Sequence, residues 1–170
     1  MNAHFERYQA MAQESIDTCP PYPADRFAGR GIVICAGGAK YFTCAWVCIN
    51  MLRDAGCDLP IELWYLGELE MNDEMRALVE PLGVRCIDGY EVRKRHPVRR
   101  LNGWELKPYA IIHSAFEHVL FLDADNVPLI DPSILFESEG YAKTGAIFWP
   151  DYGPIPRRCD VWELCGVPFR

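Results

Sequence analysis

The chain has 170 residues, enough for a domain with a sizeable hydrophobic core. Half of its residues are apolar and 24% are charged, which is typical of a globular protein. Its net charge of −7, from 17 basic and 24 acidic residues, argues against a nucleic-acid groove or an anionic membrane surface as the main partner.

The sequence lacks the features of a membrane-spanning or disulfide-rich protein. No apolar run reaches the roughly 18 residues that a membrane span needs, and the polar residues 1–23 lack the pattern of a signal peptide. Four of the eight cysteines, Cys35, Cys44, Cys48 and Cys86, lie in apolar segments and are expected to behave as small buried hydrophobes. Because there is no CxxC pair and no His/Cys cluster with zinc spacing, we expect reduced cysteines.

The pattern of apolar residues predicts strands that alternate with helices. Residues 1–18 are expected to form an amphipathic helix, which a Pro- and Gly-rich lead-in follows up to residue 30. A β-branched run from Gly31 that ends in two glycines predicts the first strand and a turn. Residues 39–56 have helical spacing, and because this segment is apolar on nearly all sides, we expect a buried helix.

Four more strands are predicted after this helix, and helices separate most of them. Asn72 is a candidate N-cap for the helix between the second and third strands, and Pro108 lies near the first turn of the helix before the fourth. A short helical turn is expected to begin at Asp131. The strands are expected at 60–67, 84–89, 118–125 and 144–152, the helices at 72–83 and 104–116, and a polar, basic loop at 90–103.

This alternation predicts an α/β domain with a largely parallel sheet, in which ligands bind beyond the carboxyl ends of the strands. The two glycines after the first strand and a pair of aspartates after the fourth both lie at such ends. We therefore expect them in one site. We divide the chain into a lead-in of residues 1–30 and an α/β domain of residues 31–170.

The aspartate pair is Asp123 and Asp125, in the segment EHVLFLDADNVPL. Buried carboxylates are costly unless something pairs with them. Two carboxylates at i and i+2 offer the hard oxygen ligands that Mg²⁺ or Mn²⁺ prefers, and such an ion would bridge the protein to a diphosphate. A plain turn is the alternative, because Asp and Asn are common turn residues.

Two enzyme families use an apolar strand that ends in this pattern. In haloacid-dehalogenase-like phosphatases Asp123 would be a nucleophile that forms an aspartyl-phosphate. There the motif usually lies on the first strand of the core, whereas three strand–helix units precede it here. In GT-A glycosyltransferases a DxD pair follows the fourth strand and holds a metal on the diphosphate of a nucleotide sugar, so the chain order favours that family.

Residues 31–67, 103–129 and 145–153 resemble the mannosyltransferase family related to fungal α-mannosyltransferases, and the resemblance runs from Gly31 to Val167. It implies a GT-A, Rossmann-like fold. It also implies a metal-dependent transferase that moves a hexose, mannose from GDP-mannose, to a glycan or other hydroxyl acceptor with an α-linkage, as in protein glycosylation. The residues themselves leave UDP-glucose and UDP-galactose open as donors.

By this resemblance, Asp123 would contact the nucleotide ribose and the metal, and Asp125 would coordinate the metal, Mn²⁺ or Mg²⁺. Lys107 would match a lysine that in related enzymes reaches the donor phosphates or sugar. It also lies near a helix N-terminus, where anions bind favourably. A solvated lysine at a helix end is the alternative.

Further residues would contact the base and the sugar, and several have structural alternatives. Small residues after the first strand would let the backbone approach the base closely. The alternatives are a core aromatic for the tyrosine, and a buried strand-end tryptophan beside a turn aspartate. These residues are Ala36, Gly37, Gly38 and Tyr41 at the base, and Trp149 and Asp151 at the sugar.

The chain departs from the GT-A pattern in its last third. A third metal ligand in GT-A enzymes is often a late histidine, yet no histidine follows His118. The acceptor side normally comes from later sequence as well. We therefore expect a piece of a longer protein or a shortened homologue, which could bind a nucleotide sugar without catalysis, and we assign no catalytic residue. The chain would be cytoplasmic if complete, and in the Golgi lumen if it is a piece of a eukaryotic enzyme.

A basic segment precedes the helix at 104–116. It could attract an anionic donor or acceptor, but a solvated loop is the more common explanation in a chain of negative net charge. We interpret His113 and His118 as structural. The segment contains Arg93, Lys94, Arg95, His96, Arg99 and Arg100.

Overall fold

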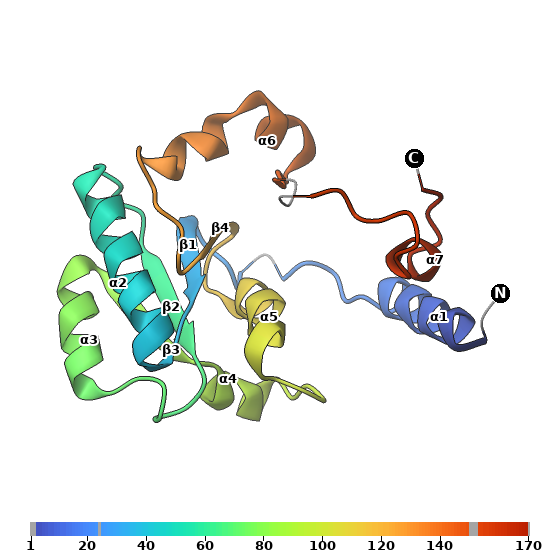
Figure 1. Cartoon of the computed structure of the whole chain (residues 1–170), viewed down its shortest axis with the longest axis horizontal. Coiled ribbons are helices and arrows are strands. Elements are labelled where there is room, and N and C mark those ends of the chain that lie inside the picture. Colours follow the sequence, from blue (N-terminus) through green and yellow to red (C-terminus); the bar gives the residue numbers. More distant parts are fainter. Residues whose placement is uncertain (1–2, 24, 150–152, 170) are drawn as a thin grey trace. The chain divides into compact units, whose positions relative to one another are not determined.

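The computed structural model describes residues 3–23, 25–149 and 153–169. The chain forms two compact units, of which residues 24–143 make the larger and residues 1–23 with 144–170 the smaller (Figure 1). Each unit is described by itself below. This grouping does not test the predicted division at residue 30, which stays a prediction.

The larger unit contains, within the described residues, a four-stranded sheet with the order β3-β2-β1-β4. All neighbouring strands pair in parallel, so the predicted α/β class is confirmed and the sheet is consistent with a Rossmann-like GT-A fold. The order reverses at β1, because β2 and β3 lie on one side of it and β4 on the other. The strands are β1 (Arg30–Cys35), β2 (Ile61–Tyr65), β3 (Val84–Asp88) and β4 (His118–Asp123).

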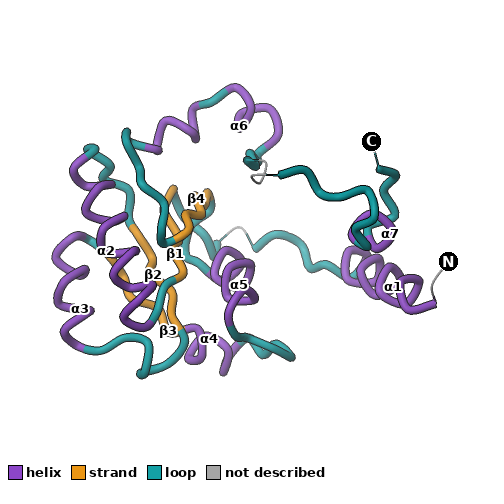
Figure 2. The backbone as a smooth tube through the Cα atoms, in the orientation of Figure 1, coloured by secondary structure: helices purple, strands orange, loops and turns teal. Residues whose placement is uncertain are grey.

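Helices cover both faces of this sheet (Figures 1 and 2). Ile32 and Ile34 of β1 pack in one core cluster with α2, and Val33 packs with Trp64 and α5 in a second cluster on the opposite face. Alternate residues of β1 therefore face opposite layers, as the period of two in a strand requires. The larger unit also contains α2 (Gly38–Asp54), α3 (Asp73–Val79), η1 (Glu80–Leu82), α4 (Gly89–Arg95), η2 (Gly103–Glu105), α5 (Leu106–His113) and η3 (Pro132–Glu137), and α6 (Glu139–Thr144) ends at the boundary.

Most predicted elements are confirmed, together with the polar residues that begin them. The Asn72 side chain caps α3 by accepting a hydrogen bond from the Met75 backbone N–H at 2.8 Å. Pro108 lies in the first turn of α5. Asp131 begins η3, and its carboxylate accepts a hydrogen bond from the Ser133 backbone N–H at 2.9 Å. Side-chain capping of this kind is a local effect, which explains why the sequence alone locates these starts.

The prediction that the helix at 39–56 is buried nearly all round is wrong. α2 buries one face, which includes Phe42 and Cys48, whereas Trp46 and Val47 are exposed. A helix in an outer layer faces the sheet along one stripe only. Apolar residues on its other side are therefore left at the surface of the described unit.

Residues 89–95 form α4, where the sequence pattern predicts a loop. Asp88 caps this helix by accepting a hydrogen bond from the Tyr90 backbone N–H at 2.8 Å. Lys94 and Glu91 form an i,i+3 ion pair of 2.6 Å between Nζ and Oε1, and the basic last turn complements the negative end of the helix dipole. The predicted loop is therefore correct only after residue 95.

The predicted fifth strand is absent from residues 144–149, and residues 150–152 lie outside the described part of the chain. Gly145 has a φ of 70°, and Phe148 and Trp149 are exposed. A strand needs a neighbour for its backbone hydrogen bonds, and the described residues of the smaller unit contain no other strand. The apolar run alone is therefore insufficient to form a strand at residues 144–149.

The smaller unit pairs the predicted N-terminal helix, α1 (Ala3–Asp17), with α7 (Val161–Leu164). The Gln9 side-chain amide donates to the Glu163 backbone oxygen at 2.5 Å. All eight cysteines lie in the described residues and are unpaired, as predicted. Among the described helices, none has both the length and the apolarity that crossing a membrane demands.

A buried carboxylate ties β2 to its surroundings in the larger unit. The Glu62 side chain is 1% exposed and accepts hydrogen bonds from Trp64 Nε1 at 2.8 Å and from the Ala115 backbone N–H at 3.1 Å. Its charge is balanced by the Arg85 guanidinium, whose side chain remains 60% exposed. Burial of the charge is thus compensated by one cation and two N–H donors.

We expect Arg85→Gln to destabilise the protein by about 1–3 kcal/mol, because it leaves a buried carboxylate without its cation and the cation's own exposure limits the loss. Chemical denaturation at neutral pH measures this change. Lys94→Gln is the matched control: it breaks an exposed pair with Glu91 and should cost under about 0.5 kcal/mol. Equal losses in the two variants would contradict a special role for the buried carboxylate.

Candidate functional site

The carboxyl ends of β1 and β4 lie side by side where the strand order reverses. Cys35 at the end of β1 is the register partner of Asp123 at the end of β4. In open α/β sheets the crevice at such a reversal is where ligands bind. The glycine turn and the aspartate pair, predicted to share one site, therefore begin from paired residues.

The aspartate pair lies in a turn that exposes its carboxylates. The backbone N–H of Asn126 donates to the backbone carbonyl oxygen of Asp123 at 3.0 Å, which is the hydrogen bond of a β-turn. Ala124 between the two aspartates packs into the core beside α2, whereas the Asp123 side chain is 47% exposed and Asp125 is exposed. The turn predicted as an alternative is thus present, and it leaves neither carboxylate deeply buried.

Lys107 is the ionic partner of Asp123. Its Nζ pairs with Asp123 Oδ1 and lies 4.3 Å from the centroid of the Trp104 ring and 5.6 Å from that of Phe121. Both distances permit cation–π attraction. Since the lysine side chain is only 28% exposed, the alternative of a solvated lysine at a helix end is wrong.

Two thiols report the electrostatics around the aspartates. Burial raises the pKa of Cys35 to about 12, while Lys107 lowers it and Asp123 raises it by smaller amounts. Burial also raises the pKa of Cys48, on α2, to about 11, and the Asp125 carboxylate adds to this. Both thiols therefore stay protonated at neutral pH and are poor nucleophiles or metal ligands.

The glycine turn has its own structural reasons for lacking side chains. A Cβ on Gly37 would lie 2.2 Å from Glu70 Oε2, and that oxygen accepts a hydrogen bond from the Leu66 backbone N–H at 2.7 Å. Gly38 has a φ of 67°, a conformation that favours glycine. Its N–H donates to the Glu70 backbone oxygen at 2.8 Å. Contact of this turn with a nucleotide base stays a prediction, as it does for Ala36, which is buried.

Comparison with known proteins identifies the family of this chain. A model of the family described as "Mannosyltransferase putative" matches residues 29–159. The chain belongs to this mannosyltransferase family. The matched range covers the whole sheet and both turns at the carboxyl edge.

Similarity to curated fungal proteins supports this membership. Alpha-1,2-mannosyltransferase MNN2 of Candida albicans is 30% identical over 158 residues, which cover 87% of this chain and 26% of the relative. MNN2 of Saccharomyces cerevisiae is 31% identical over 148 residues, 85% of this chain and 25% of the relative. MNN21 of Candida albicans is 33% identical over 159 residues, 86% of this chain and 22% of the relative. The chain thus spans about a quarter of the length of these relatives.

Membership of the mannosyltransferase family favours the glycosyltransferase interpretation of the aspartate pair over the aspartyl-phosphatase one. The family match covers Asp123, Asp125 and Lys107, and their predicted roles stay predictions. Of the described residues, no group of three or more His, Cys, Asp or Glu side chains is arranged to hold a metal. Two carboxylates at this edge suit an ion that completes its coordination with donor phosphates.

The aromatic candidates are all at the surface. Tyr41, in the first turn of α2, is 55% exposed, so the alternative of a core aromatic is wrong. Trp149 is 64% exposed, so the alternative of a buried strand-end tryptophan is also wrong. It belongs to the smaller unit, and Asp151 lies outside the described residues. Their predicted contacts with the base and the sugar stay predictions.

Three residues that the sequence analysis did not select also lie at this edge. Asp88 ends β3 and accepts hydrogen bonds from the backbone N–H groups of Gly67 at 3.0 Å and Tyr90 at 2.8 Å. The Tyr90 ring packs against Gly67, and Trp104 lies under Lys107. The signal for Asp88 was available, because an aspartate that ends a predicted strand follows the same rule as Asp123. His118, by contrast, is structural as predicted, since its Nδ1 lies 2.7 Å from the Tyr141 hydroxyl.

We expect Gly37→Ala to destabilise the larger unit by about 1–3 kcal/mol, because the new methyl overlaps Glu70. A double variant with Glu70→Ala should cost less than the sum of the single losses, because the clash is gone. Thermal unfolding measures both. Gly153→Ala is the control, with open space around its Cβ and no positive φ, and should be neutral. Strictly additive losses would contradict the predicted contact.

Proposed function

We propose that the carboxyl edge of the larger unit binds the nucleotide-diphospho-sugar donor of a metal-dependent mannosyltransferase. The donor is GDP-mannose, and the mannose passes to a glycan or other hydroxyl acceptor with an α-linkage. The observation that carries the proposal is the Lys107–Asp123 pair, which lies at the strand-order reversal inside the matched family region.

The pair suits a diphosphate because it offers both charges that such a ligand needs. Asp123 and Asp125 would hold Mn²⁺ or Mg²⁺, and such an ion, when bound, neutralises the charge that develops on the leaving diphosphate. Lys107 would bind phosphate oxygens as a point charge. Trp104 and Phe121 restrict the lysine before the ligand arrives, which lowers the entropy lost on binding.

A non-catalytic donor-binding protein is the second candidate. It is favoured by the few metal ligands at this edge. The described residues supply two exposed carboxylates there and no group of three metal ligands. It predicts nucleotide binding without sugar transfer or donor hydrolysis. Turnover of GDP-mannose by this chain would exclude it, whereas binding without turnover would exclude the enzymatic proposal for this chain.

We expect GDP with Mn²⁺ to raise the melting temperature, since a ligand that binds only the folded state stabilises it. Thermal shift with GDP or UDP, each with and without Mn²⁺, tests the nucleotide and the metal together. Asp125→Asn should remove the metal-dependent part of the shift, while Asp58→Asn, at another exposed aspartate, should keep it. The proposal fails if neither nucleotide gives a metal-dependent shift.

We expect Lys107→Met to weaken GDP binding at least about tenfold, because a charge-assisted contact to phosphate of about 1.5–3 kcal/mol is lost. Binding of Mn²⁺ alone should be unchanged or tighter, because Asp123 no longer pairs with the ammonium. Calorimetric titration of each ligand separates the two effects. Lys94→Met serves as control and should leave both affinities unchanged. A parallel loss of Mn²⁺ and GDP binding would mean that the lysine only maintains the local structure.

A further inference from the structure

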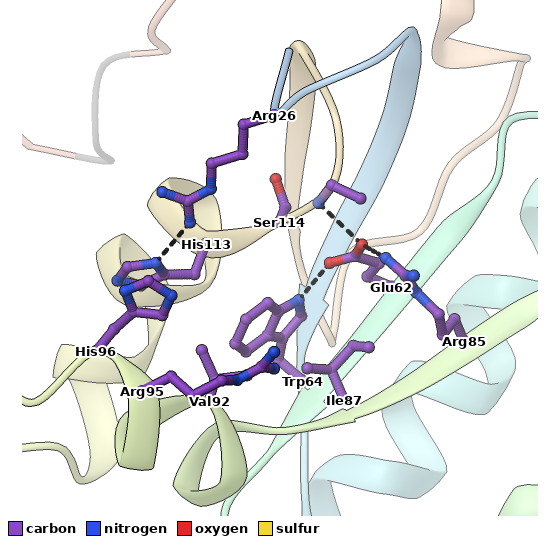
Figure 3. Close-up of a pocket in the computed structure, with 11 residues that line it drawn as sticks. Arg26, Glu62, Trp64, Arg85, Ile87, Val92, Arg95, His96, His113 and Ser114 are labelled. Carbon is purple, nitrogen blue, oxygen red and sulfur yellow. Dashed lines mark hydrogen bonds and ion pairs between the residues drawn. The ribbon is translucent and has the colours of Figure 1, made fainter. Parts of the chain in front are cut away.

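A polar cavity of about 310 Å³ lies on the face of the sheet that carries α4 and α5 (Figure 3). Glu62, the second residue of β2, forms part of its lining, as do Arg26, which precedes β1, and Ala115, which precedes β4. These residues lie toward the amino ends of the strands, whereas the proposed donor site lies at the carboxyl ends. None of the residues that line the cavity is one of those proposed for the donor site, and all of them belong to the larger unit.

The one carboxylate in the inner wall of the cavity already has hydrogen-bond and ionic partners. Glu62 is bound by Trp64 Nε1, by the Ala115 backbone N–H and by the Arg85 guanidinium (Figure 3). The Trp64 ring, Ile87 and other apolar groups complete this wall. Because Arg85 already neutralises the Glu62 carboxylate, this side chain repels an anionic ligand only weakly and attracts a cationic ligand only weakly.

Cationic and imidazole side chains surround the remaining space. Arg26 Nη2 lies 2.9 Å from His113 Nδ1, and since a guanidinium only donates, the imidazole nitrogen accepts. Burial, reinforced by His96 and Arg26, lowers the pKa of His113 to about 4. His113 is therefore neutral at pH 7 with its proton on Nε2, and it stacks on His96 with 4.6 Å between centroids. Arg95, in the last turn of α4, is exposed and also lines the cavity.

The balance of charge favours an anionic ligand. With the histidines left out of the count, Arg26, Arg85 and Arg95 against Glu62 leave a formal charge of +2. The carboxyl-terminal ends of α4 and α5 lie nearby, and each contributes at most about −0.5 of an elementary charge. A charge near +1 therefore remains, in a chain whose net charge is −7. The helix ends account for part of this basic cluster and not for all of it.

We propose that this cavity binds an oxyanion of the phosphate class, either free or carried on a small molecule. Arg26 and Arg95 supply planar forks that match phosphate oxygens, which a lysine could not do as well. The volume is at the lower end of the range for small-molecule sites, about 300–1,000 Å³, so a small ligand fits and a peptide does not. The Trp64 and Ile87 wall leaves an apolar surface for the rest of that ligand.

Titration of the chain with inorganic phosphate in the presence of EDTA tests this site without the metal. The side-chain NMR signals of His96 and His113 report on the cavity directly. We expect saturable shifts of both signals at constant ionic strength. Arg26→Gln and Arg95→Gln should each weaken the affinity at least about tenfold, the loss of one charge-assisted contact. A hexose phosphate binds more tightly than phosphate if the ligand is a phosphorylated small molecule, and equally if it is the free anion.

Two control variants make the result specific. Arg99→Gln removes the same charge from a neighbouring residue that does not line the cavity, and it should change the affinity less than twofold. Lys107→Met should also leave it unchanged, so a failure of the proposed donor site would be distinguishable. The proposal is overturned if the histidine signals do not saturate, or if Arg99→Gln weakens binding as much as Arg95→Gln, since that would indicate diffuse attraction to a basic surface.

Discussion

The parallel pairing of β1 with β4 is the constraint on which the candidate site depends. It makes Cys35 and Asp123 register partners, so two turns that are far apart in sequence begin at neighbouring points. Because β2 and β3 lie on the other side of β1, the turns flank the reversal of strand order, where backbone and side chains diverge enough to admit a ligand. A sheet of the same strands in sequential order would separate the glycine turn from the aspartates.

The aspartate turn resolves the difficulty of ending a buried strand in carboxylates. Its hydrogen bond from Asn126 to Asp123 directs Ala124 inward, and the two acidic side chains stay in contact with solvent. Asp123 then needs only partial compensation, which Lys107 supplies. In the proposed donor site, a metal that engaged Asp123 would compete with the lysine. A donor diphosphate would relieve this competition by accepting hydrogen bonds from the lysine, which would couple binding of the ion to binding of the donor.

The sequence predicts the elements whose causes are local and fails where a distant partner decides. Asn72 and Asp131 begin their helices through contacts within three residues, and the buried strands are evident from their apolar runs. α4 was missed because its basic composition masked the cap at Asp88. The strand expected at 144–152 is absent from its described residues, 144–149, because no pattern within the segment can supply a neighbouring strand. Likewise, the spacing places Asp123 at a strand end, but only the fold pairs it with Lys107, sixteen residues earlier.

Local cations matter more than net charge for the anionic ligands proposed at both ends of the sheet. A net charge of −7 acts over distance, but salt screens exposed charges beyond about 8–10 Å. Within that range the proposed ligands would meet Lys107 at one end and Arg26 at the other. Each is held by neighbours before binding: Lys107 by Trp104, and Arg26 by His113 and by the Phe27 ring, 4.8 Å away. A cation already held in one position loses less conformational entropy when it binds. Aromatic and imidazole neighbours would therefore allow an acidic protein to present the two proposed anion sites with few cations at each.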